Sequence, residues 1–156
     1  MKLVVQNVES ASVKVVNDDW SIKKEEKINK GVLIYFWVSK KTTNLEFNIV
    51  KNSLDKFVDK FPRMRRLKNK DGRLDATLDD INWEILVVSN FTLYASNKNW
   101  TKMDFSASWE YGKAEKIYEY FVDKLKEKFV VKTWEFGAMM QVESINDGPV
   151  NYVMEI

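Results

Sequence analysis

Apolar residues recur along this chain with helical spacing in two segments. The spacing predicts one amphipathic helix over residues 44–61 and a second over residues 113–129. The apolar stripe of the first comprises Leu45, Ile49, Leu54, Phe57, Val58 and Phe61. The stripe of the second comprises Ala114, Ile117, Tyr118, Phe121, Leu125 and Phe129. We expect Thr42, Thr43 or Asn44 to cap the start of the first helix and Pro62 to end it.

Between and around these helices, apolar and β-branched runs predict strands. Gly31 opens the continuous run Val32–Val38, which suits a buried central strand. Further strands are predicted at 2–8, 12–16, 84–88, 130–135, 139–145 and 150–155, with a break at Glu9-Ser10-Ala11 between the first two. The pattern indicates an α/β fold: one compact domain, residues 1–156, of mixed and antiparallel β-sheet covered by two main helices.

The amino-acid composition limits the classes of protein to which this chain can belong. The 156 residues are 45% hydrophobic and carry a net charge of +2, so a folded core is expected and a nucleic-acid partner is not demanded. A basic stretch at residues 60–73 is consistent with a nucleic-acid contact or with a solvated loop. No apolar run reaches the length of a membrane helix, and residues 1–6 do not resemble a signal peptide. We expect a cytoplasmic protein without a membrane partner.

The chain contains neither histidine nor cysteine. A nucleophile activated by histidine, general acid–base catalysis by histidine and thiolate chemistry are therefore excluded. Zinc sites almost always use these residues, and the one acidic pair that stands out, Asp79-Asp80, suits a turn better than a Mg²⁺ site. We expect no metal and no cofactor. An enzyme of this composition would work with main-chain dipoles, hydroxyls, amides or groups of its substrate.

The C-terminal residues contain a Gly-Pro pair, Gly148-Pro149, between two alternating apolar runs. Taken alone, Asn146-Asp147-Gly148-Pro149 favours a hairpin turn. Such a pair can also present bare main-chain carbonyls and amides to a ligand, and a bond preceding proline is where a cis peptide is found.

Several segments, in order, resemble the D-aminoacyl-tRNA deacylase (D-Tyr-tRNA deacylase) family. The start, residues 1–8, resembles the family's first strand, and residues 30–33 resemble the entry to its third. Residues 85–95 are close to its Ser-Gln-Phe-Thr-Leu motif, residues 136–142 to its Phe-Gly-Ala segment, and residues 146–150 to its closing Asn-x-Gly-Pro motif. Together, in this order, the motifs are specific.

The resemblance implies a homodimer that hydrolyses the ester between a D-amino acid, or glycine, and the 3′ end of tRNA. It implies chemistry that uses the RNA's own 2′-hydroxyl and main-chain amides at the oxyanion. The implied catalytic residues are Ser89, Asn90, Phe91 and Thr92. The implied chiral gate, which enters the partner subunit's site, comprises Asn146, Gly148 and Pro149. The implied adenosine pocket comprises Phe136, Gly137 and Met140.

The chain departs from the family pattern at several positions. Asn90 stands where the family has glutamine, Asn151 replaces a threonine, and Trp37 stands where the family has glycine near the end of a strand. The segment Ser96–Ser106 keeps a Phe-Ser pair but loses glycine, proline and most of the charge. These departures leave two alternatives beside D-aminoacyl-tRNA hydrolysis. One is a non-catalytic paralogue that binds tRNA or another nucleic acid, and the other is a deacylase of altered specificity.

Overall fold

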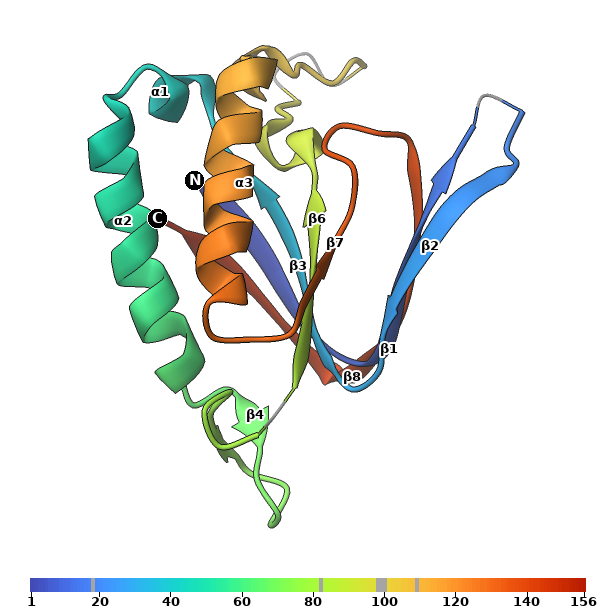
Figure 1. The fold of residues 1–156 in the computed structure, drawn as a ribbon, viewed down its shortest axis with the longest axis vertical. Helices are drawn as coiled ribbons and strands as arrows, with labels where there is room; N and C mark the ends of the chain where they lie inside the picture. The colour runs from blue at the N-terminus through green and yellow to red at the C-terminus, as the bar shows by residue number, and fades with distance from the viewer. Residues whose placement is uncertain (18, 82, 98–100, 109) are drawn as a thin grey trace.

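A mixed β-sheet of six strands is the centre of the structure, a computed structural model that describes residues 1–17, 19–81, 83–97, 101–108 and 110–156 (Figure 1). β1 (Lys2–Val16) pairs antiparallel with β2 (Ile22–Ile28), β3 (Gly31–Trp37) and β8 (Met140–Glu155). β3 continues the sheet in parallel with β6 (Glu84–Ser89), and β6 in parallel with β7 (Val131–Thr133). The parallel and antiparallel pairings confirm the expected mixed α/β fold.

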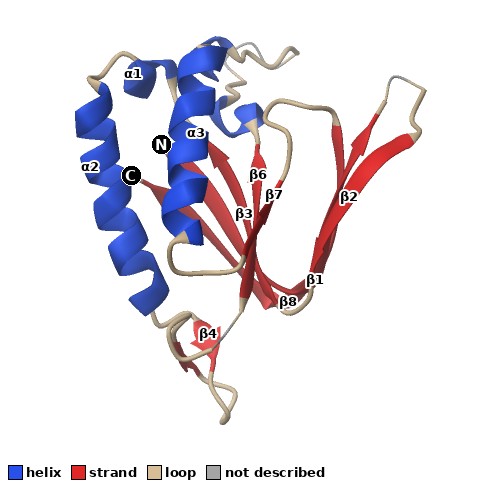
Figure 2. Ribbon diagram, viewed as in Figure 1, coloured by secondary structure: helices blue, strands red, loops and turns tan. Residues whose placement is uncertain are grey.

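Two helices cover one face of this sheet (Figure 2). α2 (Phe47–Lys60) and α3 (Tyr111–Lys126) lie side by side and bury most of their apolar residues on β3 and β6. Leu45 and Ile49, predicted in the first stripe, are instead about half exposed, because the buried face of α2 runs through Val50. Phe36 of β3 stacks on Phe121 of α3 with 4.6 Å between the ring centroids. Burial of these rings stabilises the layer by about 2 kcal/mol per side chain. A second, smaller core, which includes Val13, Leu33 and Leu86, fills the opposite, concave face of the curved sheet.

The helix starts differ from the prediction. A separate short helix, α1 (Lys40–Thr43), precedes α2, and the Ser39 hydroxyl caps it by accepting from the Thr42 amide at 3.0 Å. The residues expected to cap α2 therefore belong to α1 or to its end, and α2 begins after Glu46 without a side-chain cap. At the other end, Pro62 lies in the 3₁₀ turn η1 (Phe61–Arg63), which ends α2 as expected.

The remaining short elements connect these layers. β4 (Leu67–Lys68) and β5 (Leu74–Ala76) form a two-stranded sheet beside the end of α2. Two further 3₁₀ turns, η2 (Phe91–Tyr94) and η3 (Ser106–Ser108), follow β6. The sequence pattern predicted β6 but carried no signal for η2.

Two predicted strand breaks are absent. Residues 2–8 and 12–16 form the single strand β1, because the long strand β8 pairs with β1 on both sides of the predicted break. Residues 139–145 and 150–155 likewise belong to one strand, β8, both parts of which pair with β1. The hairpin predicted at Gly148-Pro149 is therefore wrong, since tertiary pairing with β1 holds the chain extended on both sides.

A bulge replaces that hairpin. Asn146 pairs with Val8 and Asn151 with Gln6, so the four residues between Asn146 and Asn151 lie opposite the single residue Asn7. We call residues 147–150 the Gly-Pro bulge. Its Gly148–Pro149 peptide bond is cis, and Gly148 has φ +120°, a conformation that other residues rarely adopt. Gly148 and Pro149 are both exposed.

Candidate functional site

A cavity of about 720 Å³ opens beside the C-terminal ends of β3 and β6. Its walls come from those strands, from η2, η3 and the start of α3, and from the segment that leads into β8. The lining residues are Tyr35, Trp37, Val88, Ser89, Asn90, Phe91, Thr92, Phe105, Ser108, Glu110, Tyr111, Gly137, Ala138, Met139, Met140 and Val142. Six of the ten residues that the sequence assigned to a site are therefore brought together.

The corner between β6 and η2 is organised by Asn90. The Asn90 side-chain oxygen accepts from the Thr92 amide at 3.0 Å and from the Thr92 hydroxyl at 2.6 Å, which caps η2. The hydroxyl proton of Thr92 is thereby engaged. One residue earlier, Ser89 ends β6, and its hydroxyl accepts from the Gly137 amide at 3.2 Å. The Ser89 bond joins the end of β6 to the segment 136–140.

Phe91 is the first residue of η2, where a helix leaves its amides without internal partners. Among the described residues, its N–H has no hydrogen-bond partner. Its carbonyl accepts from the Ser108 hydroxyl at 2.7 Å, which fixes the following peptide group, between Phe91 and Thr92. Because the ring is 48% exposed, the residue is not part of the core. The arrangement leaves one oriented amide donor at the cavity wall.

Trp37 leaves the cavity open. Its ring lies flat on Phe136, with centroids 5.0 Å apart and planes 6° apart, and its N–H donates to the Ser108 carbonyl at 3.2 Å. Both rings are almost fully buried. Trp37 therefore lines the wall, and Phe136, assigned to the adenosine pocket, lies behind it rather than on the surface of the cavity.

The rim includes residues that the sequence did not single out. The Tyr111 hydroxyl donates to the Phe136 carbonyl at 2.7 Å, and its ring closes on Gly137, which has φ +70°. A Cβ at Gly137 would lie 2.5 Å from that ring. Glu110 adds a carboxylate beside it. Tyr35 adds a phenol whose pKa is raised by burial, so that it stays neutral and able to donate. In the sequence these side chains look like ordinary strand and helix residues, so no signal separates them from the core.

The residues assigned to the chiral gate lie elsewhere. Gly148 and Pro149 are not among the residues that line the cavity of their own chain, and neither is Asn146. The Asn146 side chain donates to the Asn7 carbonyl at 2.7 Å and accepts from the Asn151 amide at 3.1 Å. Asn151, one of the departures, therefore closes the base of the Gly-Pro bulge.

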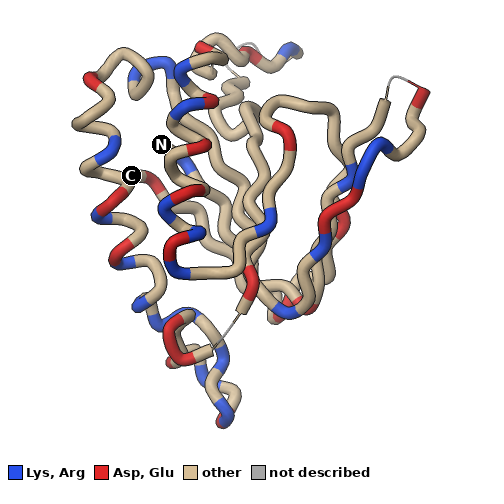
Figure 3. The backbone as a smooth tube through the Cα atoms, in the orientation of Figure 1, with Lys and Arg blue, Asp and Glu red and all other residues tan. Residues whose placement is uncertain are grey.

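Three cations of the basic stretch 60–73, whose course Figure 3 shows, are buried or paired within the fold. Arg66 is 3% exposed, Arg65 pairs with Asp75 at 2.7 Å, and Lys68 pairs with Asp147 at 3.1 Å. Within the described parts of the chain, no three acidic side chains gather as a metal site would require. No described helix is long and apolar enough to cross a membrane.

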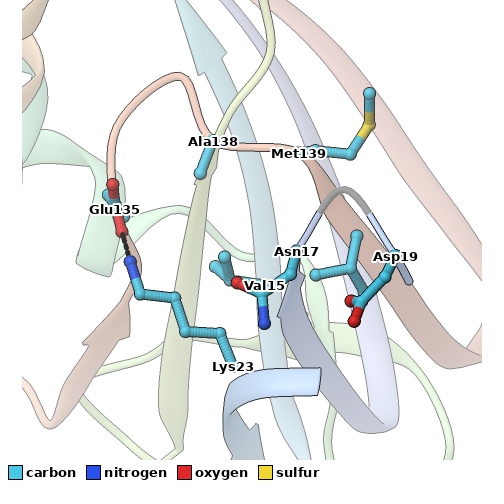
Figure 4. Close-up of a pocket in the computed structure, with 8 residues that line it drawn as sticks. Val15, Asn17, Asp19, Lys23, Glu135, Ala138 and Met139 are labelled. Carbon is cyan, nitrogen blue, oxygen red and sulfur yellow. Dashed lines mark hydrogen bonds and ion pairs between the residues drawn. The ribbon is translucent and has the colours of Figure 1, made fainter. Parts of the chain in front are cut away.

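A second hollow of about 450 Å³ adjoins the first through Ala138 and Met139 (Figure 4). Lys23 of β2 reaches across it to Glu135, with 3.0 Å between the charged atoms. Val15, Val16, Asn17 and Asp19 complete its lining. It holds a surface ion pair and none of the residues assigned to the site, and residues 135–139 separate it from the cavity. Lys98, Asn99 and Trp100 of the altered segment 96–106 lie outside the described residues.

Comparison with known proteins places these features in a family. Residues 4–155 match the sequence model of the family D-Tyr-tRNA(Tyr) deacylase. A D-aminoacyl-tRNA deacylase from Thermosipho melanesiensis is 36% identical, covering 99% of this chain and 97% of the relative. One from Staphylococcus aureus is also 36% identical, with coverages of 99% and 95%.

Solved structures of similar fold agree with this family assignment. The protein titled c-Myc DNA Unwinding Element Binding Protein superposes with a TM-score of 0.82 at 31% identity, covering 100% of this chain and 99% of that one. A probable eukaryotic D-amino acid tRNA deacylase gives a TM-score of 0.80 at 12% identity, covering 99% and 98%, which shows the same fold.

Proposed function

This chain belongs to the D-Tyr-tRNA(Tyr) deacylase family, and we propose that it hydrolyses the ester bond of D-aminoacyl-tRNA in the cavity described above. The observation that carries this conclusion is the full-length similarity to D-aminoacyl-tRNA deacylases, joined to a cavity lined by Ser89–Thr92. The activity is that of an aminoacyl ester hydrolase and serves quality control in translation. Because the proposed substrate is an aminoacyl-tRNA, tRNA is the proposed partner. We assign the enzyme to the cytoplasm.

The amide of Phe91 is the proposed oxyanion donor. It has no other partner among the described residues, and the Ser108–Phe91 bond and the Asn90 cap hold the adjoining peptide group in place. An oriented main-chain amide stabilises the charge that develops on the ester carbonyl in the transition state. Thr92 contributes to this site by holding the Asn90 side chain through its amide and hydroxyl hydrogen bonds. The chain has no histidine or cysteine, so we propose that water attacks the ester carbonyl and that the 2′-hydroxyl of the terminal ribose orients this water. The bond to the 3′ oxygen breaks, which releases the amino acid and leaves a free 3′-hydroxyl.

The terminal adenosine is proposed to lie against Gly137 and Met140. Gly137 brings bare main chain to the wall beside the Tyr111 ring, and both residues line the cavity. Phe136 supports this wall from behind, through its stack on Trp37. Aromatic and apolar surfaces of this kind suit base stacking.

The chiral gate is proposed to come from a second copy of the chain. Its residues do not line the cavity of their own chain, and Gly148 and Pro149 are exposed in the bulge. The outer side of β8 also carries exposed apolar residues: Val153 is 76% exposed and Ile145 is 62% exposed. An unpaired strand edge with such side chains favours association. In a homodimer, Gly148 and Pro149 of one subunit would enter the cavity of the other.

A deacylation time course tests the proposal. D-Tyr-tRNA, L-Tyr-tRNA and Gly-tRNA are incubated with the protein, and ester loss is compared with buffer alone. We expect rapid loss of the D-ester and the glycyl ester, with the L-ester spared. Binding of tRNA without loss of any ester would instead support a non-catalytic binder, which the family relatives do not favour. Loss of L-esters alone would support altered specificity.

A further inference from the structure

Arg66 is buried without a counter-charge. Its guanidinium lies over the Phe61 ring, 4.3 Å from the centroid, and Nη1 donates to the Asn7 side-chain oxygen at 3.2 Å. Among the described residues, its Nε and Nη2 atoms are buried and have no hydrogen-bond partner. Burial lowers the pKa of Arg66 to about 10, so the group is still charged at neutral pH. A buried, unpaired charge lowers stability, and its presence calls for a reason beyond stability.

The hydrogen bonds between Arg66 and Asn7 indicate why a charge is buried here. The side-chain amide of Asn7 donates to the Arg66 carbonyl at 3.1 Å, so the two residues bind each other reciprocally. Asn7 is 2% exposed and lies opposite the Gly-Pro bulge. Its own carbonyl accepts from the Asn146 side chain at 2.7 Å. A buried chain of hydrogen bonds thus runs from Arg66 through Asn7 to the first residue flanking the bulge.

A second connection reaches the bulge from Lys68, two residues after Arg66. Lys68 of β4 donates to the Asp147 carboxylate at 3.1 Å, and Lys30 lies 3.6 Å from its other oxygen. The hydrogen bond from Lys68 lowers the pKa of Asp147, which keeps the carboxylate charged. The Asp147 side chain is only 14% exposed, so water screens this contact less than an open surface pair.

We propose that Arg66 and Lys68 are positioning residues that hold the Gly-Pro bulge in place from behind and thereby set the preference for D- over L-aminoacyl esters. The inference rests on the proposed function, because it takes the bulge to be the chiral gate. A bulge lacks ladder hydrogen bonds and can shift. Discrimination by main-chain carbonyls and steric exclusion requires placement within about 0.5 Å. Anchors on Asn146 and Asp147 supply that placement.

The experiment compares Arg66→Met and Lys68→Met with the control Arg65→Met. Arg65 is the sequence neighbour of Arg66, but its ion pair with Asp75 is exposed and does not touch the bulge. Amide hydrogen exchange is measured on peptides covering 146–151, together with deacylation of D-Tyr-tRNA and L-Tyr-tRNA below the melting temperature of each variant. Lys68→Met leaves the core intact, so it keeps the test valid if Arg66→Met does not fold.

We expect faster exchange over 146–151 and at least a tenfold fall in the D-over-L rate ratio for Arg66→Met, with a smaller change of the same sign for Lys68→Met. Arg65→Met should change neither. Unchanged exchange in both test variants would overturn the positioning role. Faster exchange with an unchanged D-over-L ratio would overturn the link to specificity. Wild-type protein that cleaves no ester would count against the proposed function and against that link, while the exchange data would still decide the positioning role.

Discussion

Phe91 offers two separable groups to the cavity, an exposed ring and an unpartnered amide. Proline is tolerated at the first position of a helix, because the N–H that it lacks has no internal partner there. Asn90, the preceding residue, has φ −145° and ψ 97°, an extended conformation outside the α region that a following proline disfavours. Substitution can therefore remove the amide while the backbone keeps its course.

Phe91→Pro should lower kcat for D-Tyr-tRNA by about 10²- to 10³-fold, the usual cost of removing one oxyanion donor. Phe91→Ala removes the same ring, with its edge contacts to Trp37 and Phe105, but keeps the amide, so its kcat should fall by less than about tenfold. Single-turnover kinetics of both variants check this. Equal losses in the two would show that the ring, and not the amide, matters.

At this scale the sequence could predict the residues that carry a motif but not their neighbours. Ser89–Thr92, Gly137 and Met140 meet at the cavity as expected. Tyr35 and Tyr111 were missed, because alternation and helical spacing describe which way a side chain faces and not whether it meets packed atoms or a void. The use of Asn90 as a helix cap was also hidden, since η2 has no periodic signal of its own.

Among the elements, the contact between α3 and the segment 136–140 depends on Gly137. Ala at this position would meet two penalties, the positive φ and the clash with Tyr111. Gly72 has a similar φ of +77°, but a Cβ there meets nothing within 4 Å. Alanine at Gly72 therefore measures the cost of the positive φ alone. Gly112, within α3, has neither.

Gly137→Ala should lower the free energy of unfolding by about 2–3 kcal/mol, Gly72→Ala by about 1 kcal/mol, and Gly112→Ala should raise it by about 0.5–1 kcal/mol. Urea unfolding of the three variants measures these changes. Adding Tyr111→Ala to Gly137→Ala should recover the part of the loss caused by the clash. A loss at Gly137 no larger than that at Gly72 would mean that Tyr111 moves aside freely.

The elements also show where local sequence stops being informative. The stripes predicted α2 and α3, whose apolar faces are set by helical spacing alone. Gly148-Pro149 has the composition of a hairpin, yet both flanks pair with β1, and that choice depends on residues about 145 positions away in sequence. Residues 2–16 form one continuous strand, β1, for the same reason, because the long partner strand β8 pairs with it along most of its length.

At the scale of the whole molecule, the order of the elements and the order of the motifs together predicted the fold. How copies of the chain assemble cannot be read from the structure of one chain. The cavity holds the proposed oxyanion donor but not the proposed gate, so the two halves of the site belong to different copies in our proposal. Each dimer then contains two composite sites, each built from the cavity of one subunit and the bulge of the other.

This arrangement predicts complementation between two inactive variants. Phe91→Pro disables the cavity, and Gly148→Ala disables the bulge, because a Cβ there would lie 2.8 Å from the Val150 amide nitrogen. Unfolding and refolding an equal mixture should make about half of the dimers mixed, each with one intact composite site, and restore about a quarter of wild-type activity. Each variant refolded alone is the control. If cavity and bulge of the same chain cooperated instead, every chain would carry one defect and the mixture would stay inactive.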